Sequence, residues 1–230
     1  MSERVRVALV GSTGLIGRSI IEEANASDQI QLIAISRREI RVPDGVKMEM
    51  ILADPSEWDE VLKTVRPISL INALGTTWKR AGKDEEAFRA VDYDLVLETA
   101  RNAVAAGCER MVTISSVGAS LQSKNFYLRV KGEVERDLAK VGMKRLDILR
   151  PGLLKGSRQS DFRVGEGLAK IASPLIDPLL RGTKSAYRSI DARMVAQGAL
   201  ELSLRKAAGK FPHDNDGIRR AARDWNNRTS

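Results

Sequence analysis

Near the amino terminus lies the stretch Val5-Arg6-Val7-Ala8-Leu9-Val10-Gly11-Ser12-Thr13-Gly14-Leu15-Ile16-Gly17, an apolar run followed by three spaced glycines. The run predicts a buried strand, and helical periodicity begins after Gly14. In such a unit the first glycine permits a tight turn, the second lets the backbone approach a pyrophosphate, and the third brings helix and strand together. The helix N-terminus then offers free N–H groups to the anion. We therefore expect a dinucleotide to bind at Gly11, Ser12, Thr13, Gly14, Leu15, Ile16 and Gly17.

Apolar runs alternate with segments of helical period along the next 130 residues or so. The predicted strands are Arg4–Val10, Gln31–Ser36, Met48–Leu52, Ile68–Asn72, Arg110–Ser115 and Arg145–Leu149. The predicted helices lie near Leu15–Ala24, Pro55–Val65, Glu85–Ala106 and Ser123–Val141. This alternation is typical of an α/β fold, a Rossmann-type doubly wound parallel sheet.

The pattern loosens after Arg150, where Pro174 and Pro178 interrupt an apolar segment. Helices are predicted again at Asp191–Leu204 and, as a short basic helix, around Ile218–Trp225. We expect one domain, 1–230, in which 153–190 and the C-terminal tail form a small cap on the substrate side.

Composition narrows the chemistry. The chain of 230 residues has one cysteine, Cys108, and one histidine, His213, which exclude an internal disulfide, a multi-cysteine metal site and a two-histidine zinc motif. No metal is expected. Cys108 is interpreted as a small buried side chain and His213 as a solvated loop residue. The start has no signal-peptide pattern and no apolar run approaches the length of a membrane span, so we expect a cytoplasmic protein.

The formal net charge of +8 permits a nucleic-acid partner. Only 4% of the residues are aromatic, and no stacking platform or recognition motif appears, so no nucleic-acid partner is expected. Oligomeric state is left open.

The end of the second strand, Ser36-Arg37-Arg38, bears on the choice of dinucleotide. A carboxylate here would accept hydrogen bonds from a ribose, whereas an arginine pairs with a 2′-phosphate. The two arginines favour NADP(H), although they could also be ordinary solvated side chains.

Two further strand ends are candidates for the cofactor site. Asp54 follows the third strand and is a candidate to meet the adenine of the cofactor. Asp54-Pro55-Ser56-Glu57 is also a good helix start, and the two roles are compatible, although capping is the simpler single explanation. After the fourth strand, the small residues of Ala73-Leu74-Gly75-Thr76 leave room for a cofactor to cross the strand end, and Asn72 can hold the adjacent backbone.

Tyr127 and Lys131 are four residues apart and share one face of a predicted helix. Ser115 and Ser116 end the preceding strand, at the edge where such sheets bind ligands. An ammonium beside a phenol favours the phenolate, so the pair can exchange protons with a substrate oxygen that a serine holds. A tyrosine followed by a lysine at this spacing is common by chance. The position of this pair after Ser115-Ser116 favours the catalytic interpretation.

Together these motifs and Arg150-Pro151-Gly152 resemble the atypical branch of the short-chain dehydrogenase/reductase superfamily. Ala73–Thr77, Ser115–Ala119 and Asn125–Glu135 are similar to the human Tat-interacting protein oxidoreductase family and its bacterial relatives. The resemblance implies a bound NADPH, catalytic roles for Ser116, Tyr127 and Lys131, and a nicotinamide beside Pro151, Gly152 and Leu153. Which of Ser115 and Ser116 faces the substrate stays open.

The leading hypothesis is an NADPH-dependent oxidoreductase that acts on a small carbonyl or alcohol. Candidates for lining the substrate side are Thr76, Thr77, Trp78, Leu154 and Phe162. Of these, Trp78 and Phe162 could equally be ordinary packing aromatics. The alternative is a non-catalytic NADPH-binding regulatory protein or sensor that acts through a protein partner.

Overall fold

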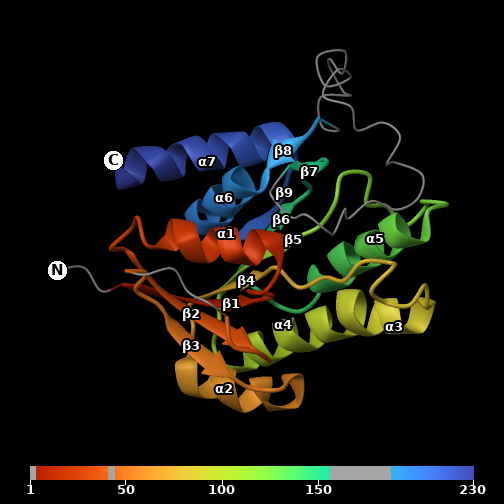
Figure 1. Cartoon of the computed structure of the whole chain (residues 1–230), viewed down its shortest axis with the longest axis horizontal. Helices are drawn as coiled ribbons and strands as arrows, with labels where there is room; N and C mark the ends of the chain where they lie inside the picture. Colours follow the sequence, from red (N-terminus) through yellow and green to blue (C-terminus); the bar gives the residue numbers. More distant parts are fainter. Residues whose placement is uncertain (1–3, 41–44, 156–187) are drawn as a thin grey trace.

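A seven-stranded parallel sheet forms the centre of the computed structural model, which describes residues 4–40, 45–155 and 188–230. The strand order is β3-β2-β1-β4-β5-β6-β9, with β9 (Gly209–His213) at one edge, and it reverses direction at β1 as in doubly wound folds (Figure 1). The first six strands are β1 (Val5–Val10), β2 (Ile30–Ser36), β3 (Glu49–Leu52), β4 (Ser69–Asn72), β5 (Arg110–Ile114) and β6 (Arg145–Leu149). All six predicted strands are confirmed, and so is the fold class.

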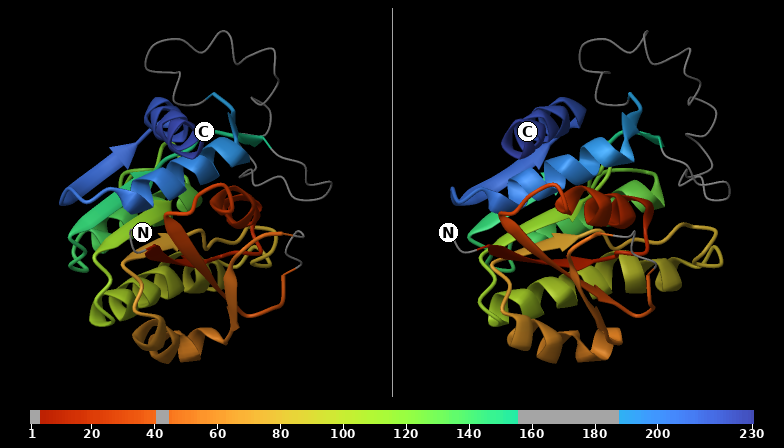
Figure 2. Two further views of the ribbon diagram at one scale, coloured as in Figure 1. Left: turned by 90° about the vertical axis from the view of Figure 1, so that its left-hand side faces the viewer. Right: turned by 60° about the vertical axis from the view of Figure 1, so that its left-hand side comes forward.

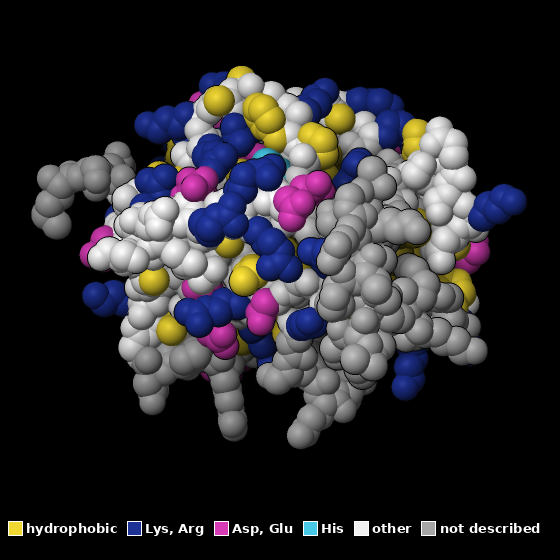
Figure 3. All heavy atoms as spheres, turned by 90° about the horizontal axis from the view of Figure 1, so that it is seen from above, with side chains coloured by type: hydrophobic (Ala, Val, Ile, Leu, Met, Phe, Trp, Pro, Cys, Tyr) yellow, Lys and Arg dark blue, Asp and Glu magenta, His cyan; other side chains and the backbone are white. Residues whose placement is uncertain are grey.

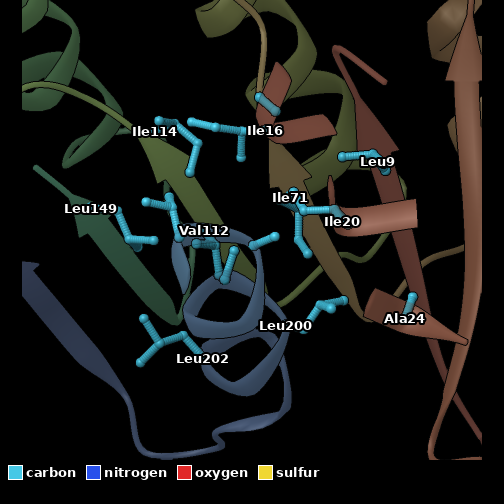
Figure 4. Packing of buried hydrophobic residues seen from close by; sticks show 14 of the residues in the cluster. Leu9, Ile16, Ile20, Ala24, Ile71, Val112, Ile114, Leu149, Leu200 and Leu202 are labelled. Carbon is cyan, nitrogen blue, oxygen red and sulfur yellow. The ribbon is translucent and has the colours of Figure 1, made fainter. Parts of the chain in front are cut away.

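Two layers of helices cover the sheet (Figure 2). On one face lie α1 (Leu15–Ala24), α6 (Ala192–Leu204) and α7 (Asn215–Thr229); on the other lie α2 (Trp58–Val65), α3 (Glu85–Arg89), α4 (Leu95–Ala105) and α5 (Phe126–Leu138). Because side chains alternate along a strand, Leu9 packs in the first core while Ala8 and Val10 pack in the second. Figure 4 shows the first core, where Ile20 of α1 and Leu200 of α6 meet the sheet beside Ile71.

The long helix expected at Glu85–Ala106 is divided into three parts. Between α3 and α4 lies a π-helical turn, η2 (Ala90–Asp94), and the Asp84 side chain caps α3 by accepting a hydrogen bond from the N–H of Ala87, at 2.9 Å. A π turn carries one more residue per turn than its α-helical neighbours and often occurs at functional sites. The buried residue of this turn is Asp92.

The C-terminal tail corrects our expectation. Gly209–His213 forms β9, the seventh strand, and α7 packs on α6, so this part of the chain completes the sheet and one helical layer instead of forming a cap. The strand Gly-Lys-Phe-Pro-His has little strand propensity, and Pro212 is tolerated because β9 lies at the sheet edge. Residues 156–187 of the expected cap, with Phe162, lie outside the described residues.

Two short strands, β7 (Leu154–Lys155) and β8 (Ile190–Asp191), pair beside the sheet. In the part of the chain that the structure describes, no helix has the length and apolar character needed to cross a bilayer.

Candidate functional site

The glycine loop lies at the carboxyl end of β1, where it opens α1. Gly11 has a φ of +81°, and a Cβ there would lie 2.3 Å from the carbonyl carbon of Ala73. A Cβ on Gly17 would lie 2.3 Å from the carbonyl oxygen of Gly11. Both distances are far too short for real atoms, so the loop, the helix and the end of β4 approach one another as closely as they do only because glycine stands at both positions.

Two features of this loop suit an anionic ligand. Gly14 is the N-cap residue of α1 and provides no side-chain cap, so the first N–H groups of the helix have no acceptor within it. The Ser12 hydroxyl is buried and has no hydrogen-bond partner among the described residues. A buried hydroxyl without a partner costs about 1–3 kcal/mol. A pyrophosphate fits both groups of donors.

At the end of β2, the Ser36 hydroxyl donates a hydrogen bond to the Arg38 carbonyl at 2.8 Å and shapes the turn that carries the two arginines. The side chains of Arg37 and Arg38 are exposed, and neither has an interaction with another described residue. They are therefore available to a ligand. Asp54 forms a capping box with Glu57, whose carboxylate accepts a hydrogen bond from the Asp54 N–H at 2.8 Å.

The loop after β4 is held from both ends. Asn72 is buried; its amide donates to the Thr113 hydroxyl at 3.1 Å and its oxygen accepts from the N–H of Leu74 at 3.1 Å. At the other end, the N–H of Thr76 donates to Oδ2 of Asp92 at 2.6 Å. The backbone from Ala73 to Thr76 is thus fixed at the carboxyl edge of the sheet, next to the glycine loop.

Tyr127 and Lys131 share one face of α5, whose N-cap Asn125 accepts a hydrogen bond from the N–H of Leu128. The Lys131 ammonium nitrogen lies 6.0 Å from the centre of the Tyr127 ring. Tyr127 is half-buried, and its hydroxyl has no hydrogen bond with any described residue. The hydroxyl can therefore donate a proton to a ligand or accept one from it. The structure therefore brings together the two residues that we expected to form the proton-transfer pair.

Asp92 is a residue that sequence reasoning missed. Its side chain is 1% exposed, and Oδ1 lies 2.8 Å from Nζ of Lys131, which is 7% exposed. A signal was present: Phe88, Asp92 and Val96 follow one another at four-residue steps, which places an acidic residue within the apolar stripe of the helix.

The two adjacent serines have different environments. Ser115 is buried, and its hydroxyl donates a hydrogen bond to Glu135, which also binds Arg150 through both carboxylate oxygens. This carboxylate raises the pKa of the Arg150 guanidinium. Ser116 is half-buried, and among the described residues its hydroxyl makes only a long contact, 3.3 Å, to the Val117 carbonyl. Ser115 is therefore engaged in packing α5 against the sheet, which leaves Ser116 for a ligand.

The loop after Ser116 is fixed against α5. The N–H of Ser120 donates to the Leu128 carbonyl at 3.1 Å, and a Cβ on Gly132 would lie 2.5 Å from the Ser120 carbonyl carbon. The close approach at Gly132 thus keeps the Ser116 loop beside the first turn of α5, where Tyr127 lies.

Aromatic side chains surround Tyr127 on one side. Its ring meets Phe88 edge-on at 5.9 Å between centroids, and Phe126 lies 5.6 Å from Phe88 and 5.5 Å from Trp78. Trp78, for which substrate lining and aromatic packing were both open, is a half-buried member of this cluster.

The backbone after β6, expected beside a nicotinamide, is held by a residue that sequence reasoning missed. The Gly152 N–H donates to Oδ1 of Asn215 at 2.9 Å, and Nδ2 of Asn215 donates to the Arg188 carbonyl at 2.6 Å. Asn215 is buried at the start of α7. The only sequence signal was a helix start after Asp214. The Pro151 carbonyl accepts from the Val117 N–H at 3.0 Å, which joins this segment to the Ser116 loop.

The expectation for His213 was wrong, whereas that for Cys108 is confirmed. His213 ends β9, and its Nε2 lies 2.8 Å from Oδ1 of Asp147, which also binds Arg145 at 2.6 and 2.8 Å. Cys108 is 5% exposed, and burial raises the pKa of its thiol to about 12. No three His, Cys, Asp or Glu side chains within the described ranges are grouped as ligands for a metal ion.

Part of the positive charge lies over α6 and α7, where Figure 3 shows Lys and Arg with acidic side chains between them. Arg205 pairs with Asp224 at 2.6 Å and Arg228 with Glu201 at 2.8 Å. Arg220 and Arg223 on α7 are exposed.

Comparison with known proteins identifies the family. The family model HIM1 matches residues 44–177, more than half of the chain. "Protein fmp52, mitochondrial" from Emericella nidulans is 32% identical over 219 residues, which cover 92% of this chain and 93% of the relative. The chain belongs to the HIM1 and FMP52 family. The FMP52 protein of Saccharomyces cerevisiae, also named mitochondrial, is 36% identical over 162 residues, with 69% of this chain and 70% of the relative covered.

These names correct one expectation. We expected a cytoplasmic protein, but relatives of the family from E. nidulans, Candida albicans and S. cerevisiae are all named as mitochondrial proteins. The cytoplasmic expectation relied on the amino-terminal pattern and on the lengths of the apolar runs, and the names of the relatives contradict it.

Solved structures of other proteins confirm the fold of this chain. MoeE5 in complex with UDP-glucose and NAD superimposes with a TM-score of 0.67 at 15% identity, with 90% of this chain and 74% of that chain covered. The WbmG enzyme of Bordetella bronchiseptica in complex with NAD gives 0.65 at 15% identity, covering 93% and 73%. The UDP-Glc/GlcNAc 4-epimerase of Campylobacter jejuni gives 0.67 at 12% identity, covering 94% and 82%. The chain thus has the Rossmann-type fold of these proteins. The resemblance to the short-chain dehydrogenase/reductase superfamily, and within it to the Tat-interacting protein family, stays a prediction.

Proposed function

We propose that this protein is an NADP(H)-dependent oxidoreductase that transfers a hydride between the nicotinamide and a small carbonyl or alcohol. The observation that carries the proposal is the Tyr127 hydroxyl, which has no hydrogen bond to a described residue and lies one helical turn from the Lys131 ammonium. This pair lies at the sheet edge that also carries the glycine loop. Structural relatives solved with NAD and the resemblance to the Tat-interacting protein oxidoreductase family support the same class.

The residues fit a dinucleotide along the carboxyl edge of the sheet. Gly11–Gly17 and the start of α1 would hold the pyrophosphate, with the Ser12 hydroxyl as a buried donor. Arg37 and Arg38 would pair with the 2′-phosphate. The backbone from Ala73 to Thr76 and that of Pro151, Gly152 and Leu153 would lie along the rest of the cofactor.

When bound, the nicotinamide supplies or accepts the hydride. The chain's own residues handle the oxygen and the proton. Ser116 donates a hydrogen bond to the substrate oxygen and polarises the carbonyl, and Tyr127 gives that oxygen its proton in reduction or removes it in oxidation. Lys131 orients the ribose and favours the phenolate during transfer. The aromatic cluster of Phe88, Trp78 and Phe126 keeps water from one side of the Tyr127 ring.

Calorimetric titration with NADPH and NADH tests the choice of cofactor. We expect tighter binding of NADPH, and we expect Arg37→Ala and Arg38→Ala each to weaken NADPH binding about tenfold, since each removes a charge-assisted hydrogen bond to a phosphate. NADH affinity should not change. Lys47→Ala, an exposed cation elsewhere on the surface, is the matched control. Equal affinities of the wild type for the two dinucleotides would contradict the assignment.

A further inference from the structure

Asn215 is a buried polar residue whose side-chain amide binds outside its own helix. It is the first residue of α7 and is 1% exposed. The helix does not need it as a cap, because the Asp214 carboxylate already accepts a hydrogen bond from the Gly217 N–H at 2.8 Å. The Asn215 oxygen accepts from the Gly152 N–H at 2.9 Å, and its nitrogen donates to the Arg188 carbonyl at 2.6 Å. Asn215 thus joins two segments that are distant from it in the chain.

The Pro151–Gly152 peptide unit is held on both sides. This peptide is trans, and a trans peptide directs its C=O and its N–H to opposite sides. The Pro151 carbonyl accepts from the Val117 N–H at 3.0 Å, whereas the Gly152 N–H donates to Asn215 on the other side. The first bond comes from the loop that carries Ser116, and the second comes from α7. Together they fix the orientation of this peptide unit relative to the Ser116 loop.

The neighbouring backbone is fixed in the same way, but it leaves an acceptor available. The Arg150 N–H donates to the His213 carbonyl at 2.8 Å, and the Leu153 carbonyl accepts from the Ile190 N–H at 2.8 Å. The Gly152 carbonyl has no hydrogen bond with any described residue. A carboxamide, such as that of a nicotinamide, carries N–H donors that need an acceptor of this kind. The segment after β6 is therefore both fixed and able to bind such a group.

We propose that Asn215 is a positioning residue for the nicotinamide half of the cofactor, which it serves by fixing the Pro151–Gly152 peptide beside the Ser116 loop. This inference rests on the proposed function and gives the C-terminal helix a part in it. The adenine half would bind to the glycine loop and to the end of β2, and Asn215 has no hydrogen bond to either segment. The two halves of the dinucleotide should therefore respond differently to a change at Asn215.

Calorimetric titration with a whole and a truncated ligand tests this difference. NADPH contains both halves, whereas adenosine 2′,5′-bisphosphate has the adenine half with its 2′-phosphate and no nicotinamide. Asn215→Leu keeps a side chain of similar size and removes both hydrogen bonds. We expect NADPH to bind about tenfold more weakly to this variant, and the bisphosphate to bind within a factor of about two of the wild type. Equal losses for the two ligands, or no loss for NADPH, would overturn the proposal.

Two further variants give controls. Asn215→Asp keeps an oxygen for the Gly152 N–H and removes the donor to the Arg188 carbonyl. NADPH should bind to it within a factor of about three of the wild type, and a loss as large as that of Asn215→Leu would contradict the part that we give to the Gly152 bond. Asn227→Leu makes the same substitution at an exposed position of α7 and should change neither affinity.

A second substitution covers the case in which Asn215→Leu does not fold, since it leaves the Gly152 N–H and the Arg188 carbonyl without their partner. Asn215→Ser has a side chain too short to bind both groups, but it leaves room for water to reach them. Circular dichroism shows whether each variant is folded. The same selective loss of NADPH affinity is expected for Asn215→Ser, and its absence would overturn the proposal.

A failure here is distinguishable from a failure of the proposed function. A wild-type protein that does not prefer NADPH to NADH would contradict the proposed cofactor, whatever Asn215 does. A wild-type protein that prefers NADPH, and whose Asn215 variants lose no more affinity for NADPH than for the bisphosphate, would keep its function and lose this account of the C-terminal helix.

Discussion

Two buried aspartates of this protein, Asp92 and Asp147, have the same kind of partner and opposite roles. Asp147 on β6 binds Arg145 through both carboxylate oxygens and contacts His213, and Arg145 also donates to the Ala207 carbonyl at 2.8 Å. Both carboxylate oxygens of Asp147 thus have hydrogen-bond partners. Asp92 contacts Lys131 and the Thr76 N–H, but Oδ1 lacks a well-aligned hydrogen bond among the described residues.

This difference distinguishes a cluster with a structural role from one with a chemical role. Buried polar groups in native proteins are nearly always satisfied, so a complete cluster is explained by packing alone. An incomplete cluster at a strand's carboxyl end, beside a tyrosine whose hydroxyl is available, is explained better by a ligand or a reaction. The residue types are similar at both places; the completeness of their hydrogen bonds distinguishes them.

The largest effect should come from the incomplete cluster. Tyr127→Phe removes the proton donor and keeps the ring that packs against Phe88, so turnover should fall about a thousandfold. NADPH affinity, measured by calorimetry, should stay within a factor of about three of the wild type, because the phenol contributes little to ground-state binding. Retained turnover in this variant would remove Tyr127 from the mechanism.

The complete cluster should affect stability instead. Arg145→Met leaves Asp147 buried with much of its charge uncompensated, and should lower the free energy of unfolding by about 3–5 kcal/mol. Denaturant unfolding measures this loss. Where the variant is folded, its NADPH affinity should equal that of the wild type. A large loss of cofactor binding by a folded Arg145→Met protein would mean that the two clusters do not differ in role as we describe.

The smallest effect should come from the exposed pairs on α5. Arg136, and less strongly Lys140 and Tyr93, hold the pKa of Asp137 well below its usual range. A carboxyl group with a lowered pKa stabilises the fold at pH values above its unfolded pKa, about 3.9, and this contribution is lost as the pH falls.

Asp137→Asn should therefore cost less than about 1 kcal/mol at neutral pH, since these partners are largely exposed. The difference from the wild type should shrink below about pH 4, as followed by urea unfolding at several pH values. A cost that is the same at pH 3 and pH 7 would show that packing, and not charge, carries the effect.

Features of the structure that depend on a local sequence pattern were predicted correctly. The strand–turn–helix unit from Val5 to Ala24, the arginines after Ser36 and the Tyr127–Lys131 spacing all appear where they were expected. Each depends on residues that are close together in the chain, and glycine spacing or a four-residue step is visible there without a structure.

What the sequence could not predict depends on distant contacts. The π turn at Ala90–Asp94 adds one residue to a helix, and its reason is the pairing of Asp92 with Thr76 and Lys131, which no local pattern encodes. In the same way, β9 forms because Gly209–His213 can pair with β6 across more than 60 residues of chain, and not because its residues favour strands.

The most direct test of the central claim is the consumption of NADPH by the wild-type protein over a panel of small aldehydes and ketones. We predict that at least one carbonyl compound is reduced, with one alcohol formed for each NADPH consumed. If the protein binds NADPH selectively and yet consumes none across the panel, the claim that Tyr127 and Lys131 form a working reductase site is contradicted.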